Sequence, residues 1–178
     1  MTLNLPHNFR YCPVCGSTLV MQIHGDSPTP TCGNAACAFI FWQNAKPAAC
    51  VLIPNQQGEL LMTVRDIEPD KGLLDLPGGF LHETEEPGIG AAREVLEELG
   101  VTITIDACIG HAISTYGDNS YYVLNIGFTA HIISGSPQPL AEIASLEWVN
   151  PDTVLDQRLA FTSNADMFSL WRAYKHNL

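Results

Sequence analysis

Three glutamates near the middle of the 178-residue chain have the spacing of neighbours on one helical face. Glu94, Glu97 and Glu98 lie at positions i, i+3 and i+4, which brings their carboxylates together in a helix. Like charges at this spacing destabilise an isolated helix by roughly 0.2–0.5 kcal/mol per pair. Because hard divalent cations take oxygen ligands, we predict a cation among these carboxylates. The alternative is a solvated acidic helix face.

Glycines and an arginine next to these glutamates favour the cation site. Gly78 and Gly79 precede the acidic segment, and a residue without a side chain allows the backbone to approach a ligand closely. Arg93 can bind a carboxylate through two parallel hydrogen bonds, and Glu85 is a candidate partner.

The stretch 79–101, GFLHETEEPGIGAAREVLEELGV, resembles the box of the Nudix family, GX5EX7REUXEEXGU, in which U is a bulky aliphatic residue. Every fixed position of the box is filled. These positions are Gly79, Glu85, Arg93, Glu94, Val95, Glu97, Glu98, Gly100 and Val101. So many specified positions in so short a stretch make the match far more specific than a lone glycine motif.

The resemblance implies an α/β fold, the Nudix α/β/α sandwich, and a hydrolase that cleaves a phosphoanhydride bond. Its substrate would be a nucleoside diphosphate linked to another moiety: ADP-ribose, NADH, FAD, a nucleotide sugar or a dinucleoside polyphosphate. By the match, Glu94, Glu97 and Glu98 would hold catalytic Mg²⁺ or Mn²⁺, Arg93 would belong to the catalytic machinery, and a backbone carbonyl near Gly78 would be a further ligand. Either Glu94 or Glu98 would act as general base.

Three residues outside the box are further candidates. Glu142, six residues before Trp148, resembles a position where several Nudix members contribute an additional metal-binding or catalytic glutamate. Arg65, at a predicted strand end, is a candidate phosphate contact, and Tyr116 lies where dinucleoside-polyphosphate hydrolases carry a tyrosine. The alternatives are an exposed glutamate at position 142 and a core aromatic at position 116.

Four cysteines form a second constellation, with the spacing C-x2-C-x16-C-x4-C. Cys12, Cys15, Cys32 and Cys37 are soft ligands, and four of them suit a closed, structural Zn²⁺ site. Residues 1–45 are therefore predicted to form a zinc ribbon. Ribbon and box together resemble the NADH pyrophosphatase branch, although residues 110–122, GHAISTYGDNSYY, lack the SQPW-type motif of that branch.

Residues 46–178 are predicted to form the Nudix domain. Apolar runs at 48–53 and 59–64 predict a hairpin, residues 85–99 a helix ended by Gly100, and 101–109 and 122–132 two further strands. In the last strand, the alternating residues from Tyr122 to Ile132 are expected to face the core. A final helix is predicted over 163–176, capped by Ser163 or Asn164. Cys50 and Cys108 are expected in the core.

Composition limits the partners. A formal charge of -11 disfavours binding of nucleic acid, although capped RNA ends stay a candidate substrate. A small anionic substrate would need cations to bind. Neither a long apolar run nor a signal peptide is present in the sequence, so we expect a cytoplasmic protein without membrane contact. The resemblance allows a homodimer. The competing hypothesis is a nucleotide-sensing regulatory or nucleic-acid-binding module on a Nudix scaffold.

Overall fold

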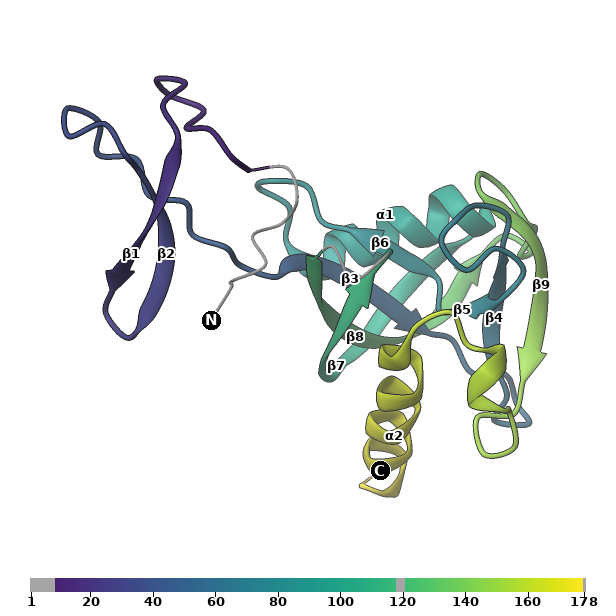
Figure 1. Cartoon of the computed structure of the whole chain (residues 1–178). Helices are drawn as coiled ribbons and strands as arrows, with labels where there is room; N and C mark the ends of the chain where they lie inside the picture. Colours follow the sequence, from purple (N-terminus) through teal and green to yellow (C-terminus); the bar gives the residue numbers. More distant parts are fainter. Residues whose placement is uncertain (1–8, 118–120, 178) are drawn as a thin grey trace. The chain divides into compact units, whose positions relative to one another are not determined.

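The computed structural model describes residues 9–117 and 121–177, and the chain divides into two compact units, Met1–Ala45 and Lys46–Leu178 (Figure 1). The division falls where the cysteine-rich segment ends. Within the described ranges, no helix is both long and apolar enough to cross a membrane.

The first unit is built on one antiparallel hairpin, β1 (Leu19–His24) and β2 (Ser27–Cys32). Gly25 adopts a φ of 61° in the turn between them, a conformation that glycine adopts without strain. The small core of this unit contains Cys12, Leu19 and Cys32. Such a core is too small to hold a fold without a further cross-link.

The second unit contains two sheets (Figure 1). One has the strand order β6-β3-β8-β7, with β3 parallel to β8 and the other pairs antiparallel, and the other is the antiparallel sheet β5-β4-β9. The strands are β3 (Lys46–Leu52), β4 (Leu60–Arg65), β5 (Leu74–Asp75), β6 (Gly78–Phe80), β7 (Thr102–Tyr116), β8 (Tyr121–Ser134) and β9 (Ile143–Val149).

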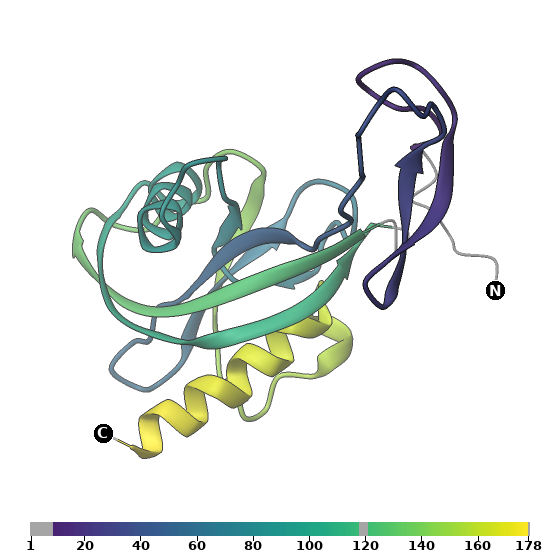
Figure 2. The ribbon, with the colours of Figure 1, turned by 90° about the vertical axis from the view of Figure 1, so that its left-hand side faces the viewer.

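Helices α1 (Pro87–Leu99) and α2 (Thr162–His176) cover opposite faces of the larger sheet (Figure 2). Successive side chains of β3 point to opposite faces of the sheet, so each face can pack against a helix. Val51 packs in the core under α1, and the neighbouring Leu52 packs in the core under α2. A short 3-10 helix, η1 (Asp156–Arg158), precedes α2. The predicted α/β/α architecture is confirmed.

The acidic helix forms for local reasons. Pro87 occupies its first turn, where a missing N–H is tolerated, and Gly100 ends it in the left-handed conformation with a φ of 66°. Val95 and Leu99 are fully buried beneath it. The helix begins two residues later than the predicted range 85–99.

Helix α2 is not capped as predicted. Its N-cap position is Phe161, without a side-chain cap hydrogen bond, and both Ser163 and Asn164 are buried inside the first turn. Asn164 donates instead to the carboxylate of Asp75, 3.1 Å away. The side chain of Asn164, predicted as a helix cap, therefore forms a tertiary contact with Asp75 instead.

The predicted hairpin of residues 48–53 and 59–64 is wrong. A turn does connect the two strands, and the N–H of Leu61 donates to the carbonyl of Ile53. Beyond that point they enter different sheets, because β6 and β8 already occupy both edges of β3. The next partners of β4 are β5 and β9.

Two core predictions on the long strands also fail. Tyr122 is 60% exposed, because β8 continues past the residues that pack under α1, whereas Phe128 and Ala130 on the same strand are buried there. Cys108 is exposed on β7, the edge strand of the sheet, while Cys50 is buried on the central strand β3 as expected.

Candidate functional site

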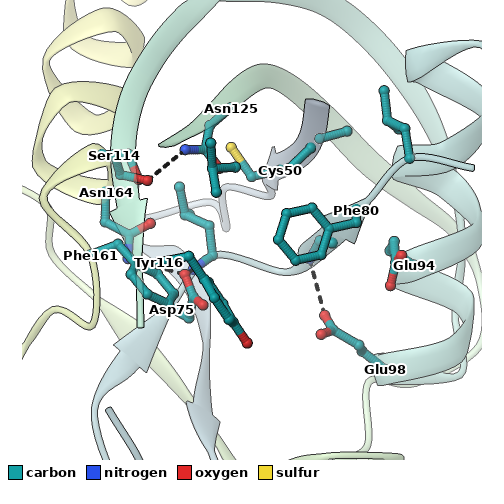
Figure 3. Close-up of a pocket in the computed structure, with 18 of the residues that line it drawn as sticks. Cys50, Asp75, Phe80, Glu94, Glu98, Ser114, Tyr116, Asn125, Phe161 and Asn164 are labelled. Carbon is teal, nitrogen blue, oxygen red and sulfur yellow. Dashed lines mark hydrogen bonds between the residues drawn. The ribbon is translucent and has the colours of Figure 1, made fainter. Parts of the chain in front are cut away.

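A cavity of about 380 Å³ opens beside the N-terminal loop of α1 (Figure 3). Its volume lies at the lower end of the range of about 300–1,000 Å³ that is typical of small-molecule sites. Acidic residues on one side of it are Glu94, Glu98 and Glu142, and an inner side is formed by β3, β7, β8 and the segment before α2.

Glu98 is anchored to the glycine loop. The backbone N–H of Gly78 donates to Oε2 of Glu98 over 3.0 Å, a bond drawn in Figure 3. Burial, together with the nearby charges of Asp75 and Glu94, raises the pKa of the Glu98 carboxyl to about 8. The hydrogen bond from Gly78 and the charge of Arg65 offset this rise only in part, so the Glu98 carboxyl holds its proton more tightly than a free glutamate does.

Glu94 lies against the second glycine of the loop. A Cβ placed on Gly79 would come within 2.6 Å of the Glu94 carboxyl carbon, and one on Gly78 within 2.1 Å of the Ala49 carbonyl oxygen. Only glycine leaves room for both the strand and the carboxylate at these two positions. The side chain of Glu94 is 16% exposed and faces the cavity.

Arg93 connects the loop to the helix. Its Nε donates to Oε1 of Glu85 at 2.7 Å and its Nη2 to Oε2 of Glu85 at 2.9 Å, the bidentate pair that the sequence suggested. Nη1 donates to Glu94 at 2.9 Å and to Glu97 at 3.2 Å. The hydrogen bonds from Arg93 and from the backbone N–H of His82 lower the pKa of Glu85 to about 2.

The remaining predicted acidic residues differ in position. Glu97 lies one turn from Glu94 with its side chain 55% exposed, outside the cavity lining. Glu142 lines the cavity from the segment that leads into β9, and its backbone carbonyl accepts from the N–H of Asp66. The structure therefore brings Glu94, Glu98 and Glu142 to one cavity and leaves Glu97 at its margin.

Arg65 belongs to a network that sequence reasoning missed in part. Its Nη1 donates to Asp75 at 3.0 Å and its Nε to the carbonyl of Pro69 at 2.9 Å, while Nη2 is buried and has no hydrogen-bond partner within the described residues. Asp75 also accepts from Asn164. Burial raises the pKa of Asp75, and the Arg65 charge opposes that rise. Asp75 is a charged residue within the otherwise apolar run Leu73–Leu76, and this pattern could have marked it as a site candidate in the sequence.

Tyr116 takes part in an aromatic column at the cavity. Its ring stacks on Tyr121 and on Phe161 with centroid distances of 5.6 and 5.7 Å, and Phe80 packs edge-on against it at 5.6 Å. The guanidinium of Arg65 lies over the ring of Phe161, 5.1 Å from its centroid. Tyr116 therefore lines the cavity, and its role in substrate binding stays a prediction. The stretch 110–122 also contains residues 118–120, which lie outside the described ranges.

The four predicted zinc ligands converge in the first unit. The Sγ atoms of Cys12, Cys15, Cys32 and Cys37 all lie within 4.8 Å of one another, with Cys12–Cys37 at 3.8 Å and Cys15–Cys32 at 3.4 Å. A tetrahedron with metal–sulfur bonds of about 2.3 Å has edges of about 3.8 Å. This spacing fits a four-cysteine Zn²⁺ site.

The comparisons with known proteins bear on the second unit. The model of the NUDIX domain family matches residues 44–171. The chain belongs to the Nudix family. A MutT-like protein of Streptomyces ambofaciens is 29% identical over 106 residues, 60% of this chain and 64% of that protein. A putative 8-oxo-dGTP diphosphatase of Bacillus subtilis is 33% identical over 107 residues, 58% of this chain and 65% of that protein. The Nudix chain thus spans about two thirds of the length of these relatives.

Solved Nudix structures share the fold. A NUDIX hydrolase from Nitrosomonas europaea superposes with a TM-score of 0.69 and 24% identity, covering 93% of this chain and 89% of that one. An ADP-ribose pyrophosphatase from Streptococcus suis gives a TM-score of 0.56 with 17% identity, covering 73% and 92%. At these identities the likeness establishes the Nudix fold alone.

Proposed function

We propose that this Nudix protein is a divalent-cation-dependent pyrophosphohydrolase that cleaves the phosphoanhydride bond of a nucleoside diphosphate linked to another moiety. The observation that carries the proposal is the placement of Glu94 and Glu98, one turn apart on α1, in the wall of a cavity of about 380 Å³. Phosphoryl chemistry depends mainly on positioning and charge neutralisation, and cations held by these carboxylates would supply the neutralisation.

The residues present fit Mg²⁺ or Mn²⁺. Glu94, Glu98 and Glu142 provide hard oxygen donors, and the raised pKa of Glu98 reports negative charge that a cation would neutralise. Glu97 would join them from the margin. The main-chain ligand of this loop would be a carbonyl oxygen, because hard cations take oxygen ligands, while the Gly78 N–H donates to Glu98. Bound cations would neutralise phosphate oxygens and acidify a water molecule.

The chain's own residues would position the carboxylates, accept a proton and contact the substrate phosphate. Arg93 fixes the directions of Glu85, Glu94 and Glu97, so we assign it a positioning role. Either Glu94 or Glu98 would accept the proton of the attacking water. Arg65, which lines the cavity, would be the contact for a substrate phosphate oxygen.

A substrate panel tests this function. The purified protein is incubated with ADP-ribose, NADH, FAD, nucleotide sugars, dinucleoside polyphosphates and NAD-capped RNA, the last because a Caenorhabditis elegans relative, 26% identical over 95 residues and covered for 24% of its length, is an NAD-capped RNA hydrolase. Release of a nucleoside monophosphate that requires Mg²⁺ or Mn²⁺ and disappears in Glu98→Gln is expected. Absence of turnover across the panel, with either cation, would refute the proposal.

For the first unit we propose a structural Zn²⁺ held by Cys12, Cys15, Cys32 and Cys37. Its small core and the convergence of four thiols within 4.8 Å support this role. A zinc ribbon would then lie at residues 1–45, ahead of a catalytic domain at 46–178.

A further inference from the structure

The inner side of the cavity differs in chemistry from the acidic side. Alternate residues of two neighbouring strands face it, namely Ser114 and Tyr116 from β7 and Val123 and Asn125 from β8. Ala48 and Cys50 of β3 add small side chains. This side therefore combines a few polar groups with apolar and aromatic surface, away from the carboxylates of α1.

Asn125 and Ser114 form the polar centre of this inner side (Figure 3). Nδ2 of Asn125 donates to Oγ of Ser114 at 2.9 Å. The asparagine amide retains one N–H and its carbonyl oxygen, and the serine retains its O–H. Within the described part of the chain, these remaining groups form no other hydrogen bond, although Ser114 is only 7% exposed. Polar groups in such a position favour a ligand that pairs with them.

Aromatic rings flank the same space. Phe80 is the last residue of β6 and remains 37% exposed, and Phe161 lines the cavity from the segment before α2. Both rings contact Tyr116, which holds them in place. Exposed aromatic surface next to a small polar centre suits a flat heteroaromatic ring, whose faces stack and whose edge forms hydrogen bonds.

The charge of the lining excludes a polyanionic occupant. Asp75, Glu94, Glu98 and Glu142 are acidic, whereas Arg65 is the sole lysine or arginine among the described lining residues, and it is paired with Asp75. A ligand carrying phosphates around its whole circumference would meet unbalanced repulsion. An uncharged ring with one phosphorylated end fits, because cations held by Glu94 and Glu98 would neutralise the phosphates at that end.

We propose that the inner side of the cavity binds the adenine ring of the substrate, with Asn125 as the residue that reads it. An asparagine amide pairs bidentately with adenine, since it accepts from the N6 amino group and donates to N7. Guanine presents two acceptors at the corresponding edge and leaves the Asn125 carbonyl oxygen unpaired. This inference rests on the proposed function and names adenine nucleotides as the substrate class of the same site.

Binding of nucleoside monophosphates tests the inference without requiring turnover. AMP, GMP, CMP and UMP, which contain no phosphoanhydride bond to cleave, are titrated by calorimetry into the wild-type protein with saturating Mg²⁺, because the acidic lining would otherwise repel the phosphate. AMP is expected to bind at least about tenfold more tightly than GMP, as for one well-formed bidentate pair. Equal affinities, or tighter binding of GMP, would overturn the adenine assignment, whereas a failure of the proposed hydrolysis would leave these titrations unaffected.

Variants assign the selectivity to Asn125. Asn125→Leu and Asn125→Asp should remove the AMP preference, because the first lacks both groups and the second lacks the donor to N7. Ser114→Ala should weaken AMP binding less, since it only releases the asparagine amide. Thr104→Ala, exposed on the same strand as Ser114, is the matched control and should bind as wild type. Thermal unfolding verifies that each variant folds, and retention of the AMP preference in folded Asn125→Leu would refute the role of Asn125.

Discussion

The backbone N–H of Gly78 donates to the carboxylate of Glu98, twenty positions along the chain, over 3.0 Å. This hydrogen bond joins the glycine loop to the acidic helix at the cavity wall. It depends on a backbone with a φ of 146° at Gly78, and a Cβ there would approach the Ala49 carbonyl oxygen to 2.1 Å. The loop and the helix therefore form one structural unit for holding carboxylates.

Gly78→Ala tests that unit. The substitution combines an unfavourable φ with a backbone clash, so we expect a loss of unfolding free energy of more than about 1–3 kcal/mol and a loss of activity. Gly72→Ala is the control, because Gly72 has a φ of 85° but no atom within 4 Å of the added Cβ. Chemical denaturation measures both variants. Equal losses would mean that the clash with β3 contributes nothing.

The glutamates of the helix should differ in importance. Glu98→Gln is expected to reduce kcat by roughly 100-fold or more, because Glu98 faces the cavity and the substitution removes its charge. Glu97→Gln should raise the Mg²⁺ concentration needed for half-maximal rate and reduce kcat less, since its side chain is 55% exposed. Glu147→Gln, in an exposed pair with Arg158, is the control. Steady-state kinetics across a Mg²⁺ series would contradict this order if Glu97→Gln were the more damaging.

Arg93→Lys tests the positioning role of the arginine. Lysine cannot reproduce the two parallel bonds to Glu85 while also reaching Glu94 and Glu97, so activity should fall by about 10–100-fold with a weaker response to Mg²⁺. Arg158→Lys changes an exposed, single-contact pair and should have no effect. An Arg93→Lys enzyme with unchanged Mg²⁺ dependence would restrict Arg93 to a role in folding.

The cation-free protein should lose stability as pH rises. The folded-state pKa of Glu98, about 8, exceeds its ordinary value of 4.5, so the folded state holds this proton more tightly than the unfolded chain. The contribution is complete below about 4.5 and is lost as pH rises towards 8. Glu85, with a pKa lowered to about 2, titrates outside this window.

Thermal unfolding from pH 5 to pH 8 in a chelator measures this effect. The melting temperature of the wild type should fall more steeply than that of Glu98→Gln, which carries no proton at this position to lose. Added Mg²⁺ should raise the wild-type melting temperature more at pH 8 than at pH 5, since the cation replaces the proton. Parallel curves for the two proteins would show that Glu98 does not titrate in this range.

The acidic helix could be predicted from the sequence, whereas the inner cavity could not. Helical spacing alone places Glu94 near Glu98, and Pro87 and Gly100 mark the ends locally. Asn164 meets Asp75 across 89 positions, a contact that no local pattern encodes. The pairing of Ser114 with Asn125 depends on the register of β7 with β8, which irregularities near residues 105–110 shift. The residues proposed to bind the base could not be predicted, because their juxtaposition follows from strand pairing.

Removal of the cysteine ligands should distinguish the proposed structural Zn²⁺ from the proposed catalytic cation. Cys12→Ser and Cys32→Ser are expected to abolish the stoichiometric zinc of the purified protein and to expose residues 9–45 to protease, because the core around Cys12, Leu19 and Cys32 needs the cross-link. Cys108→Ser, exposed on β7 and distant in the sequence from the cluster, is the control and should retain its zinc. Elemental analysis and limited proteolysis measure these outcomes.

Hydrolysis by the cysteine variants gives the second half of this test. The core clusters under α1 and α2 contain no residue of the first unit, so the domain beginning at Lys46 should keep its melting transition and its Mg²⁺-dependent activity. Full retention of zinc in Cys12→Ser would refute the four-cysteine site. Loss of hydrolysis together with zinc, in a variant whose second unit still melts normally, would contradict a purely structural role for the zinc.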